Sequence, residues 1–227
     1  MKKLKRNVKE INNLLIDPIV NAAAAERPNR ALESDAQYTK RMKNQINESF
    51  LGFKKRFENG ISILERDKKL PQDERLSKAT KMLNSNKRWI EMNQLSTLQQ
   101  SVGFSDEELA TFFEDGRSCY DKGAFDEASD VFLVLTQLNP TIGAFWTALG
   151  AAEEKKGEIE DAKNVYLIGA ELESLTLAPY LHGAKCLLML NQVEQAKFVL
   201  RRAIERAHEE EQLKPFLETA EKMLNAI

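Results

Sequence analysis

The chain has 227 residues, of which 42% are hydrophobic and 30% are charged, so it can bury a substantial core and wholesale disorder is excluded. Ten glycines and six prolines are few for a fold made of strands and turns, so the composition indicates helices. No run of about 18 apolar residues is present, and no apolar signal core follows the charged N-terminus. We therefore expect a soluble intracellular protein without stable membrane insertion.

The net charge of -2 is divided unevenly along the chain. Residues 1–100 carry 21 Lys and Arg against 12 Asp and Glu, a net charge of +9, whereas residues 101–227 carry 12 against 23, a net charge of -11. This asymmetry predicts two segments with separate roles. Either the basic segment meets an acidic surface, including the C-terminal half of the same chain, or both segments present solvated helical faces. No nucleic-acid partner is expected, because the basic residues alternate with acidic ones and no nucleic-acid-binding motif is present.

Residue types that carry chemistry are scarce. Cysteine occurs only at Cys119 and Cys186, and histidine only at His182 and His208. Two isolated thiols make neither a disulfide framework nor a zinc site. The chain also lacks a constellation of acid, base and nucleophile. We therefore expect no enzyme activity, no catalytic residue, no metal ligand and no cofactor.

Three helical stretches are predicted within residues 1–100. The first covers about 3–25, the second follows Ser34 and carries a continuous apolar stripe as far as Leu64, and the third follows Pro71 and extends to about residue 98. Long stripes with short breaks favour a helical hairpin or a pairing surface. This basic N-terminal extension is either a small independent bundle, an arm that pairs two copies into a homodimer, or a second clamp lying against the acidic half.

The C-terminal half repeats every 34 residues. Six columns of similar residues stay in register across three copies: Phe112, Trp146, Tyr180; Gly116, Gly150, Ala184; Gly123, Gly157, Asn191; Phe125, Ile159, Val193; Ala128, Ala162, Ala196; and Phe132, Tyr166, Leu200. The aromatic of the first column fills the gap between two helices, and the small residue four positions later lets those helices approach. The glycines fall where a first helix must end, since glycine adopts the left-handed conformation without strain.

These columns predict a helix at each half of each repeat. Ser105, with Glu108 three residues later, caps the first helix, and its partner begins near Asp126. The second pair is expected at 143–156 and 159–172, and the third at 177–190 and 193–207. A last amphipathic helix at 210–226 would close the array, because a repeat stack needs a cap over its final apolar face.

The period and the columns resemble the tetratricopeptide repeat. The predicted fold is all-α: a superhelix of three such helix pairs (about 109–142, 143–176 and 177–208) with a capping helix, preceded by the helical arm of residues 1–100. In this repeat the first helix of each pair lines a concave surface, and its register points Phe113, Arg117 and Tyr120 inward in copy one. The inward positions of the other copies include Thr147, Ala151, Leu181, Lys185 and Leu188. Such a groove suits a peptide, unless the N-terminal half covers it. We expect the side chains of Phe113 and Tyr120 to point into this groove, and therefore away from the packed interface between the helices of a pair.

Residues 103–227 further resemble the class II chaperones of bacterial type III secretion, the LcrH/SycD family. The similar segments are Gly103–Leu109, Gly123–Ala128, Phe145–Ala151, Tyr166–Ala170 and Pro179–Leu188. The resemblance implies a cytoplasmic chaperone that keeps hydrophobic translocator proteins soluble and secretion-competent by holding a Pro-x-Leu-x-x-Pro-like segment in the groove. Family groove positions match Phe113, Arg117, Tyr120, Phe125, Leu138 and Pro140, with Arg117 standing where an aromatic is common. The alternative function is a general repeat scaffold that bridges folded partners.

Overall fold

The structure is a computed structural model that describes residues 52, 54–66, 74–83, 97–173 and 175–227. The helix expected at residues 3–25 lies outside the described residues, as do the first part of the second predicted helix and residues 84–96 of the third. Residues 57–79 group with residues 95–227 in one compact unit. This unit therefore includes part of the stretch that the charge pattern assigns to the basic arm.

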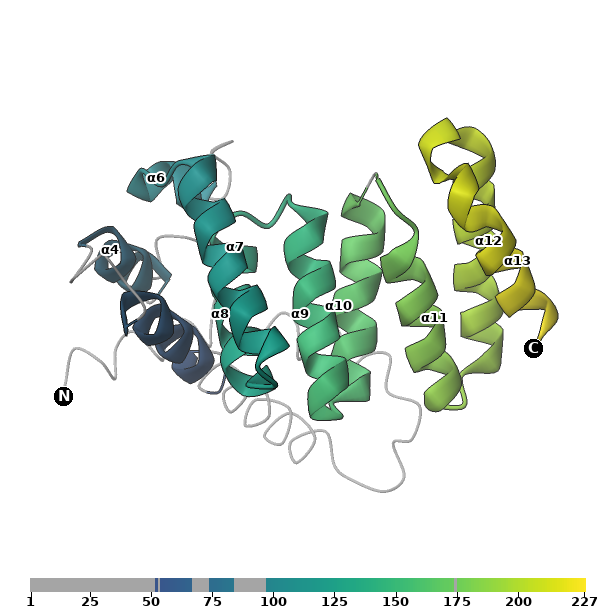
Figure 1. Ribbon diagram of the computed structural model, residues 1–227, viewed down its shortest axis with the longest axis horizontal. Coiled ribbons are helices and arrows are strands. Elements are labelled where there is room, and N and C mark those ends of the chain that lie inside the picture. The colour runs from purple at the N-terminus through teal and green to yellow at the C-terminus, as the bar shows by residue number, and fades with distance from the viewer. Residues whose placement is uncertain (1–51, 53, 67–73, 84–96, 174) are drawn as a thin grey trace, which may run out of the picture. The chain divides into compact units, whose positions relative to one another are not determined.

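Three helix pairs follow one another along the C-terminal half, which confirms the predicted all-α repeat architecture. Consecutive helices contact one another in chain order and lie side by side in Figure 1. The pairs are α7 (Asp106–Asp121) with α8 (Phe125–Leu138), α9 (Gly143–Lys156) with α10 (Ile159–Leu172), and α11 (Ala178–Met189) with α12 (Val193–Glu209). The first helices of the second and third pairs, α9 and α11, also contact each other directly.

The repeated small residues hold the helices of a pair close together. A Cβ atom on Gly116 would lie 2.7 Å from the ring of Phe132, and one on Gly150 would lie 2.7 Å from the ring of Tyr166. A longer side chain at either position would push the two helices of the pair apart. Each of these contacts joins two columns of the same repeat, so the 34-residue pattern is a pattern of helix packing.

The residues at the turn between the two helices of each pair adopt the left-handed conformation that their glycines predict. Gly123, Gly157 and Asn191 have φ angles of 77°, 87° and 59°, all in the left-handed region. Asparagine is one of the few residues other than glycine that enters this region readily. The third copy therefore keeps the same turn without a glycine.

The first repeat begins with two capping boxes. Ser105 accepts a hydrogen bond from the backbone of Glu108, and Glu108 accepts one from the backbone of Ser105 over 2.8 Å. Thr97 and Gln100 cap the short helix α6 (Leu98–Val102) in the same way. The third predicted helix, at 71–98, is thus wrong at its C-terminal end, because Thr97 starts a new helix there.

Helical residues 57–66 pack against α8, the second helix of the first repeat. A Cβ atom on Gly60 would lie 2.3 Å from the carbonyl oxygen of Asp130, so only glycine permits this approach. Asn59 Nδ2 donates to Asp130 Oδ2 over 3.2 Å, and Arg66 pairs with Glu127 at 2.8 Å. This cover explains why α8 is buried on all sides, from Ala128 to Thr136 without interruption.

Helix α4 (Glu74–Leu83) is tied to the start of the first repeat through Arg75. The guanidinium of Arg75 contacts both carboxylate oxygens of Glu108, at 2.6 and 3.1 Å, and also donates to the carbonyl of Gly103. It lies over the ring of Phe104, 4.5 Å from the ring centre. Residues 57–66 and 74–79 of the N-terminal half therefore contribute to the packing of the repeat unit.

The C-terminal segment closes the array as predicted, but it is not one continuous helix. Residues Glu211–Phe216 form the 3₁₀ helix η2, and α13 follows at Leu217–Asn225. Pro215 lacks a backbone N–H and its ring clashes with the preceding turn of an α-helix, which explains the break. Leu213 and Ala220 are fully buried in the core of the third repeat.

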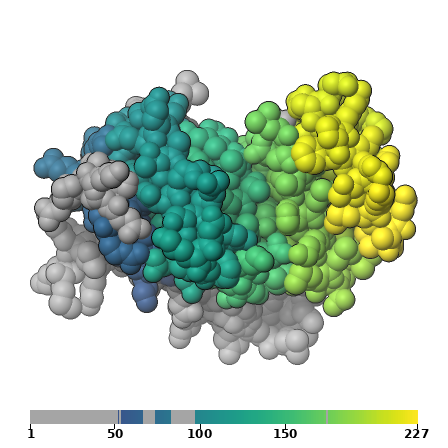
Figure 2. All heavy atoms as spheres, in the orientation of Figure 1, coloured from purple at the N-terminus to yellow at the C-terminus, as the bar shows by residue number. Residues whose placement is uncertain are grey.

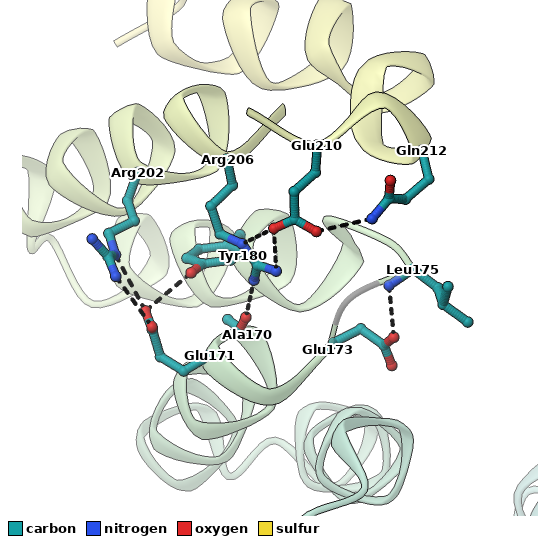
Figure 3. Close-up of polar contacts among 9 residues, drawn as sticks. All are labelled: Ala170, Glu171, Glu173, Leu175, Tyr180, Arg202, Arg206, Glu210 and Gln212. Atoms are coloured by element: carbon teal, nitrogen blue, oxygen red, sulfur yellow. Dashed lines mark hydrogen bonds and ion pairs between the residues drawn. The ribbon is translucent and has the colours of Figure 1, made fainter. Parts of the chain in front are cut away.

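Arg206 fastens the closing segment to the third repeat, as Figure 3 shows. Its guanidinium donates to the carbonyl of Ala170 over 2.8 Å and pairs with Glu210 at 2.8 Å. It also lies 5.7 Å from the ring centre of Tyr180. One side chain thus joins the end of α10, helix α11 and the start of the closing segment.

Candidate peptide-binding groove

A pocket of about 300 Å³ opens between α7 and the beginning of α9. Its apolar wall is formed by Leu109, Ala110 and Phe113 from the first repeat, and by Ile142 and Phe145 from the second. Two carboxylates, Asp106 and Glu114, stand at its rim. We call the surface along α7, α9 and α11 that contains this pocket the inner groove. In Figure 2 the molecular surface dips between the part made by α7 and the part made by the C-terminal helices.

Phe113 is half-buried, because side chains of two neighbouring helices meet its ring. Its centroid lies 5.5 Å from that of Phe132 in α8 and 5.8 Å from that of Phe145 in α9. Tyr120 is also half-buried and meets the ring of Phe125 edge-on at 5.2 Å. Our expectation that Phe113 and Tyr120 face outward is therefore wrong: both are partly core, and Phe113 is at once core and pocket wall.

The other predicted positions of the first two repeats differ in how far they reach the surface. Arg117 is exposed and pairs with Glu114 at 2.8 Å, one turn along the same helix. Thr147 and Ala151 are half-buried on α9, where the Thr147 hydroxyl donates to the carbonyl of Gly143. Leu138 is fully buried in α8, so its side chain contributes to the core rather than to an open surface.

A polar cluster links α9 and α11 across the groove. Glu154 Oε1 accepts a hydrogen bond from Lys185 over 2.7 Å, and its Oε2 accepts one from the Tyr166 hydroxyl over 3.0 Å. His182 Nδ1 lies 3.5 Å from Oε2, and the His182 ring stacks on Tyr166 at 5.2 Å. Burial favours a raised pKa for Glu154, but the hydrogen bonds from Lys185 and Tyr166 outweigh it and lower this pKa.

The groove's third-repeat wall is apolar. Leu181 and Leu188 are half-buried and pack against the core of the third repeat, while Lys185 between them is exposed. Of the predicted positions, Phe113 lines the aromatic pocket between α7 and α9. Lys185 belongs to the polar cluster between α9 and α11, which we call the charged crossing.

Sequence reasoning gave no binding role to several residues of these sites, among them Ile142, Phe145 and Glu154. Ile142 and Phe145 lie at the start of α9, outside the inward register of that helix, and they complete a pocket whose other wall is in the preceding repeat. Glu154 lies on α9, the first helix of the second pair, and the sequence analysis gave it no role. The available signal was the repeat register itself, which puts Glu154 and Lys185 on neighbouring first helices and makes a cross-repeat ion pair foreseeable.

The described residues contain no cluster of three or more histidine, cysteine or carboxylate side chains that could hold a metal ion. Both cysteines are buried, and burial raises the pKa of the Cys186 thiol to about 11. A thiol with such a pKa is a poor nucleophile at neutral pH. Among the described helices, none is long and apolar enough to cross a membrane.

No protein-family model and no curated protein matches the sequence. Solved structures do match. The type III secretion translocator chaperone SycD of Yersinia enterocolitica is 25% identical, with a TM-score of 0.53, over 58% of this chain and 98% of that one. A type III secretion complex from Aeromonas hydrophila is also 25% identical, with a TM-score of 0.56, over 63% of this chain and 95% of that one.

PcrH, solved in complex with the chaperone-binding region of PopD, is 26% identical with a TM-score of 0.50, over 55% of this chain and 93% of that one. In SycD and PcrH almost the whole chain is matched, whereas little more than half of this chain is used. The protein is thus similar in fold and sequence to translocator chaperones of type III secretion over a little more than half of its length.

Proposed function

We propose that this protein is a chaperone of bacterial type III secretion that binds a hydrophobic translocator protein through the inner groove. The observation that carries the proposal is the aromatic pocket at Phe113, on a chain 25–26% identical to SycD and PcrH over 93–98% of their lengths. PcrH has been solved in complex with the chaperone-binding region of PopD. The protein acts by binding alone, without catalysis, in the bacterial cytoplasm.

The pocket binds an apolar side chain of the cargo. Each anchor that moves from water into such a pocket contributes on the order of 1.5–3 kcal/mol. While the cargo is bound, the pocket keeps these apolar side chains out of contact with other cargo molecules, so aggregation of the cargo is suppressed. Asp106 and Glu114 at the rim favour a basic residue beside the anchor, although Arg117 offsets part of the charge of Glu114.

The charged crossing forms hydrogen bonds with backbone groups of the cargo. An extended peptide brings N–H and C=O groups that need partners once water is excluded. Lys185 and Glu154, already hydrogen-bonded to each other, supply a donor and an acceptor midway along the inner groove. A peptide that lies along α7, α9 and α11 therefore finds apolar burial at the first two repeats and polar contacts at the crossing.

Filling the pocket tests this proposal without removing core contacts. Ala110 is exposed and lines the pocket, so Ala110→Trp should leave the fold intact and occupy the anchor's place. Thr111→Trp is the matched control, since Thr111 is the next residue on the same helix, is exposed and lies outside the pocket lining. The protein is co-expressed with a candidate translocator, and the amount of cargo that co-purifies is measured.

The expected result is loss of cargo from Ala110→Trp and retention by Thr111→Trp, with equal melting temperatures. Equal retention by both variants would contradict the proposal. Binding of folded partners but of no unfolded hydrophobic cargo would favour the general scaffold instead. A peptide of the cargo's chaperone-binding segment, titrated by fluorescence anisotropy, separates these outcomes.

A further inference from the structure

A buried glutamine in front of the first repeat bonds to both sides of the aromatic pocket. Gln99 lies on α6 and is 3% exposed. Its Nε2 donates to the carbonyl of Phe104 over 3.3 Å and to Asp106 Oδ1 over 2.6 Å, where α7 begins. Its Oε1 accepts a hydrogen bond from Asn139 Nδ2 over 2.7 Å, at the end of α8. The amide nitrogen and the amide oxygen of this buried side chain therefore both have partners.

Asn139 connects Gln99 to the second wall of the pocket. Its Oδ1 accepts hydrogen bonds from the backbone N–H of Thr141, over 3.2 Å, and from the Thr141 hydroxyl, over 2.7 Å. The next residue, Ile142, lines the pocket and directly precedes α9. Asp106, the other partner of Gln99, lines the pocket from α7. One buried amide thus lies between the start of the first wall and the turn that places Ile142 in the second.

The turn between the second and third repeats shows what is particular to this one. One period of 34 residues after Asn139 stands Glu173, whose Oε1 accepts the backbone N–H of Leu175 over 3.0 Å, as Figure 3 shows. Both turns thus have a side-chain oxygen bonded to the backbone two residues later. An amide donates and accepts, whereas an ionised carboxylate only accepts. Asn139 can therefore hold its turn and donate to Gln99 at the same time, which a carboxylate cannot do.

The connection through Gln99 fixes how far apart the two walls lie. If either wall moved, a polar atom of Gln99 would lose its partner at a position that water does not reach, which is unfavourable. The pocket of about 300 Å³ between the walls then keeps its size, and an anchor that is too large must displace packed side chains. We propose that Gln99 is a positioning residue that sets the width of the pocket and thereby the size of the cargo's anchor side chain. This inference rests on the proposed function of the inner groove.

The probes are two fluorescein-labelled peptides, Gly-Pro-Lys-Leu-Ala-Ala-Pro-Gly and the same sequence with Phe in place of Leu, titrated against the full chain by fluorescence anisotropy. Gln99→Leu removes the connection, so the second wall can move away from α7. The ratio of the two affinities should then shift toward the Phe peptide by about threefold or more. Asn139→Asp keeps the oxygen that holds Thr141 but cannot donate to Gln99, so it should cause the same shift. The double variant should shift the ratio no further than either single one.

Gln100→Leu is the matched control. Gln100 is the next residue on α6, is exposed, and accepts the backbone N–H of Thr97 in the capping box of that helix. This variant loses a hydrogen bond of the same helix at a position outside the pocket lining. A residue that only stabilises the chain would change the affinities for both peptides by the same factor. The ratio therefore separates positioning from general stability.

A second measurement needs no bound peptide. Trp146 Nε1 donates to the carbonyl of Pro140 over 2.8 Å, within the turn that Asn139 holds. In protein labelled with fluorotryptophan, the fluorine NMR resonance of Trp146 should shift in both network variants and stay in place in the control. The chain has two tryptophans, and Trp89→Phe identifies which resonance belongs to Trp146.

An affinity ratio that is the same in the wild type, Gln99→Leu and Asn139→Asp would overturn the inference, and so would an equal shift in Gln100→Leu. If Gln99→Leu does not fold, Asn139→Asp decides alone, because it exchanges a single amide group for an oxygen. Absence of binding by both peptides to the wild type would contradict the proposed function. The Trp146 resonance would then still decide whether Gln99 holds the pocket wall, and an unshifted resonance would overturn that as well.

Discussion

Arg75 and Glu108 join two parts of the chain that differ in charge. The guanidinium of Arg75, in the basic N-terminal half, meets both oxygens of the Glu108 carboxylate at 2.6 and 3.1 Å. The same carboxylate completes the capping box of α7 by accepting the backbone N–H of Ser105. The start of the first repeat is thus organised by a residue of the N-terminal half.

Replacing Arg75 by Leu should lower the free energy of unfolding by about 1–2 kcal/mol, since a charge-assisted, two-pronged contact that is about one-third exposed is lost. Urea unfolding followed by circular dichroism measures the change. Lys81→Met on the same helix is the control, because Lys81 is exposed and carries the same charge. An equal effect of both substitutions would mean that general charge, and not this contact, matters.

The same contact should depend on pH. Arg75 and the Ser105 backbone lower the pKa of Glu108 in the folded protein. The stabilisation is then fully present above the carboxyl's unfolded pKa of about 4.3 and disappears as the pH falls through the lower folded pKa. The difference in unfolding free energy between wild type and Arg75→Leu should therefore be constant from neutral pH to about pH 5 and shrink below that. A difference that grows at acid pH would contradict this sign.

The repeat register could be predicted from the sequence to the residue in the second copy, where α9 and α10 have the expected bounds. The reason is that Gly157 punctuates the pair and Ala162 and Tyr166 mark its interface. The burial of Phe113 could not be predicted in this way, because the ring of Phe145 that meets it comes from the next repeat. The helical register predicts which side of a helix a residue lies on, but it does not predict which side chains of the neighbouring repeat pack against that side.

The packing of residues 57–66 against α8 could have been predicted from the apolar residues of α8. The run Val131–Leu135 is apolar on every side, which is unsuited to a helix with one solvent-exposed face. Because residues 1–100 were expected to form a separate arm, no cover for α8 was predicted. In the structure helical residues 57–66 cover α8, with Gly60 against Asp130. The break at Pro215 was likewise readable, since proline in a helix interior removes a donor.

A fragment of residues 97–227 should be less stable than the full chain and should self-associate. Without residues 57–66, the face of α8 around Val134, which is fully buried and lies against Gly60, is exposed to water. Light scattering and thermal unfolding of the fragment and the full chain measure both effects. A monomeric fragment with an unchanged melting temperature would show that the N-terminal cover is dispensable.

Ala162 tests the repeat interface itself. It is fully buried in the small core cluster that also holds Tyr166 and Cys186. Ala162→Leu should overpack this interface at a cost of about 1–3 kcal/mol. Asn164→Leu, at an exposed position two residues later on the same helix, should change stability little. Thermal melts that do not distinguish the two variants would contradict the packing of the second repeat.

The charged crossing offers a direct titration. Lys185→Met removes the hydrogen bond that most lowers the pKa of Glu154, so this pKa should rise above its value in the wild type. Carboxyl carbon chemical shifts followed by NMR across the pH range measure the change. Lys155→Met, next to Glu154 in sequence and exposed, should leave the pKa of Glu154 in place. A Glu154 pKa that is the same in wild type and Lys185→Met would mean that Tyr166 and His182 set it without Lys185.

Phe113 combines core packing with the candidate pocket, so its replacement should affect stability and binding together. Phe113→Ala loses the ring contacts with Phe132 and Phe145 and should lower the free energy of unfolding by about 1–3 kcal/mol, less than for a fully buried phenylalanine. Phe113→Leu keeps more of the packing and should recover most of this loss. Because both variants alter the pocket wall, both should bind the translocator segment less tightly than wild type. Thermal melts and peptide anisotropy on the two variants separate the effects. Full cargo affinity in Phe113→Leu together with a low melting temperature in Phe113→Ala would mean that Phe113 is a core residue only, and that the cargo is anchored elsewhere in the inner groove.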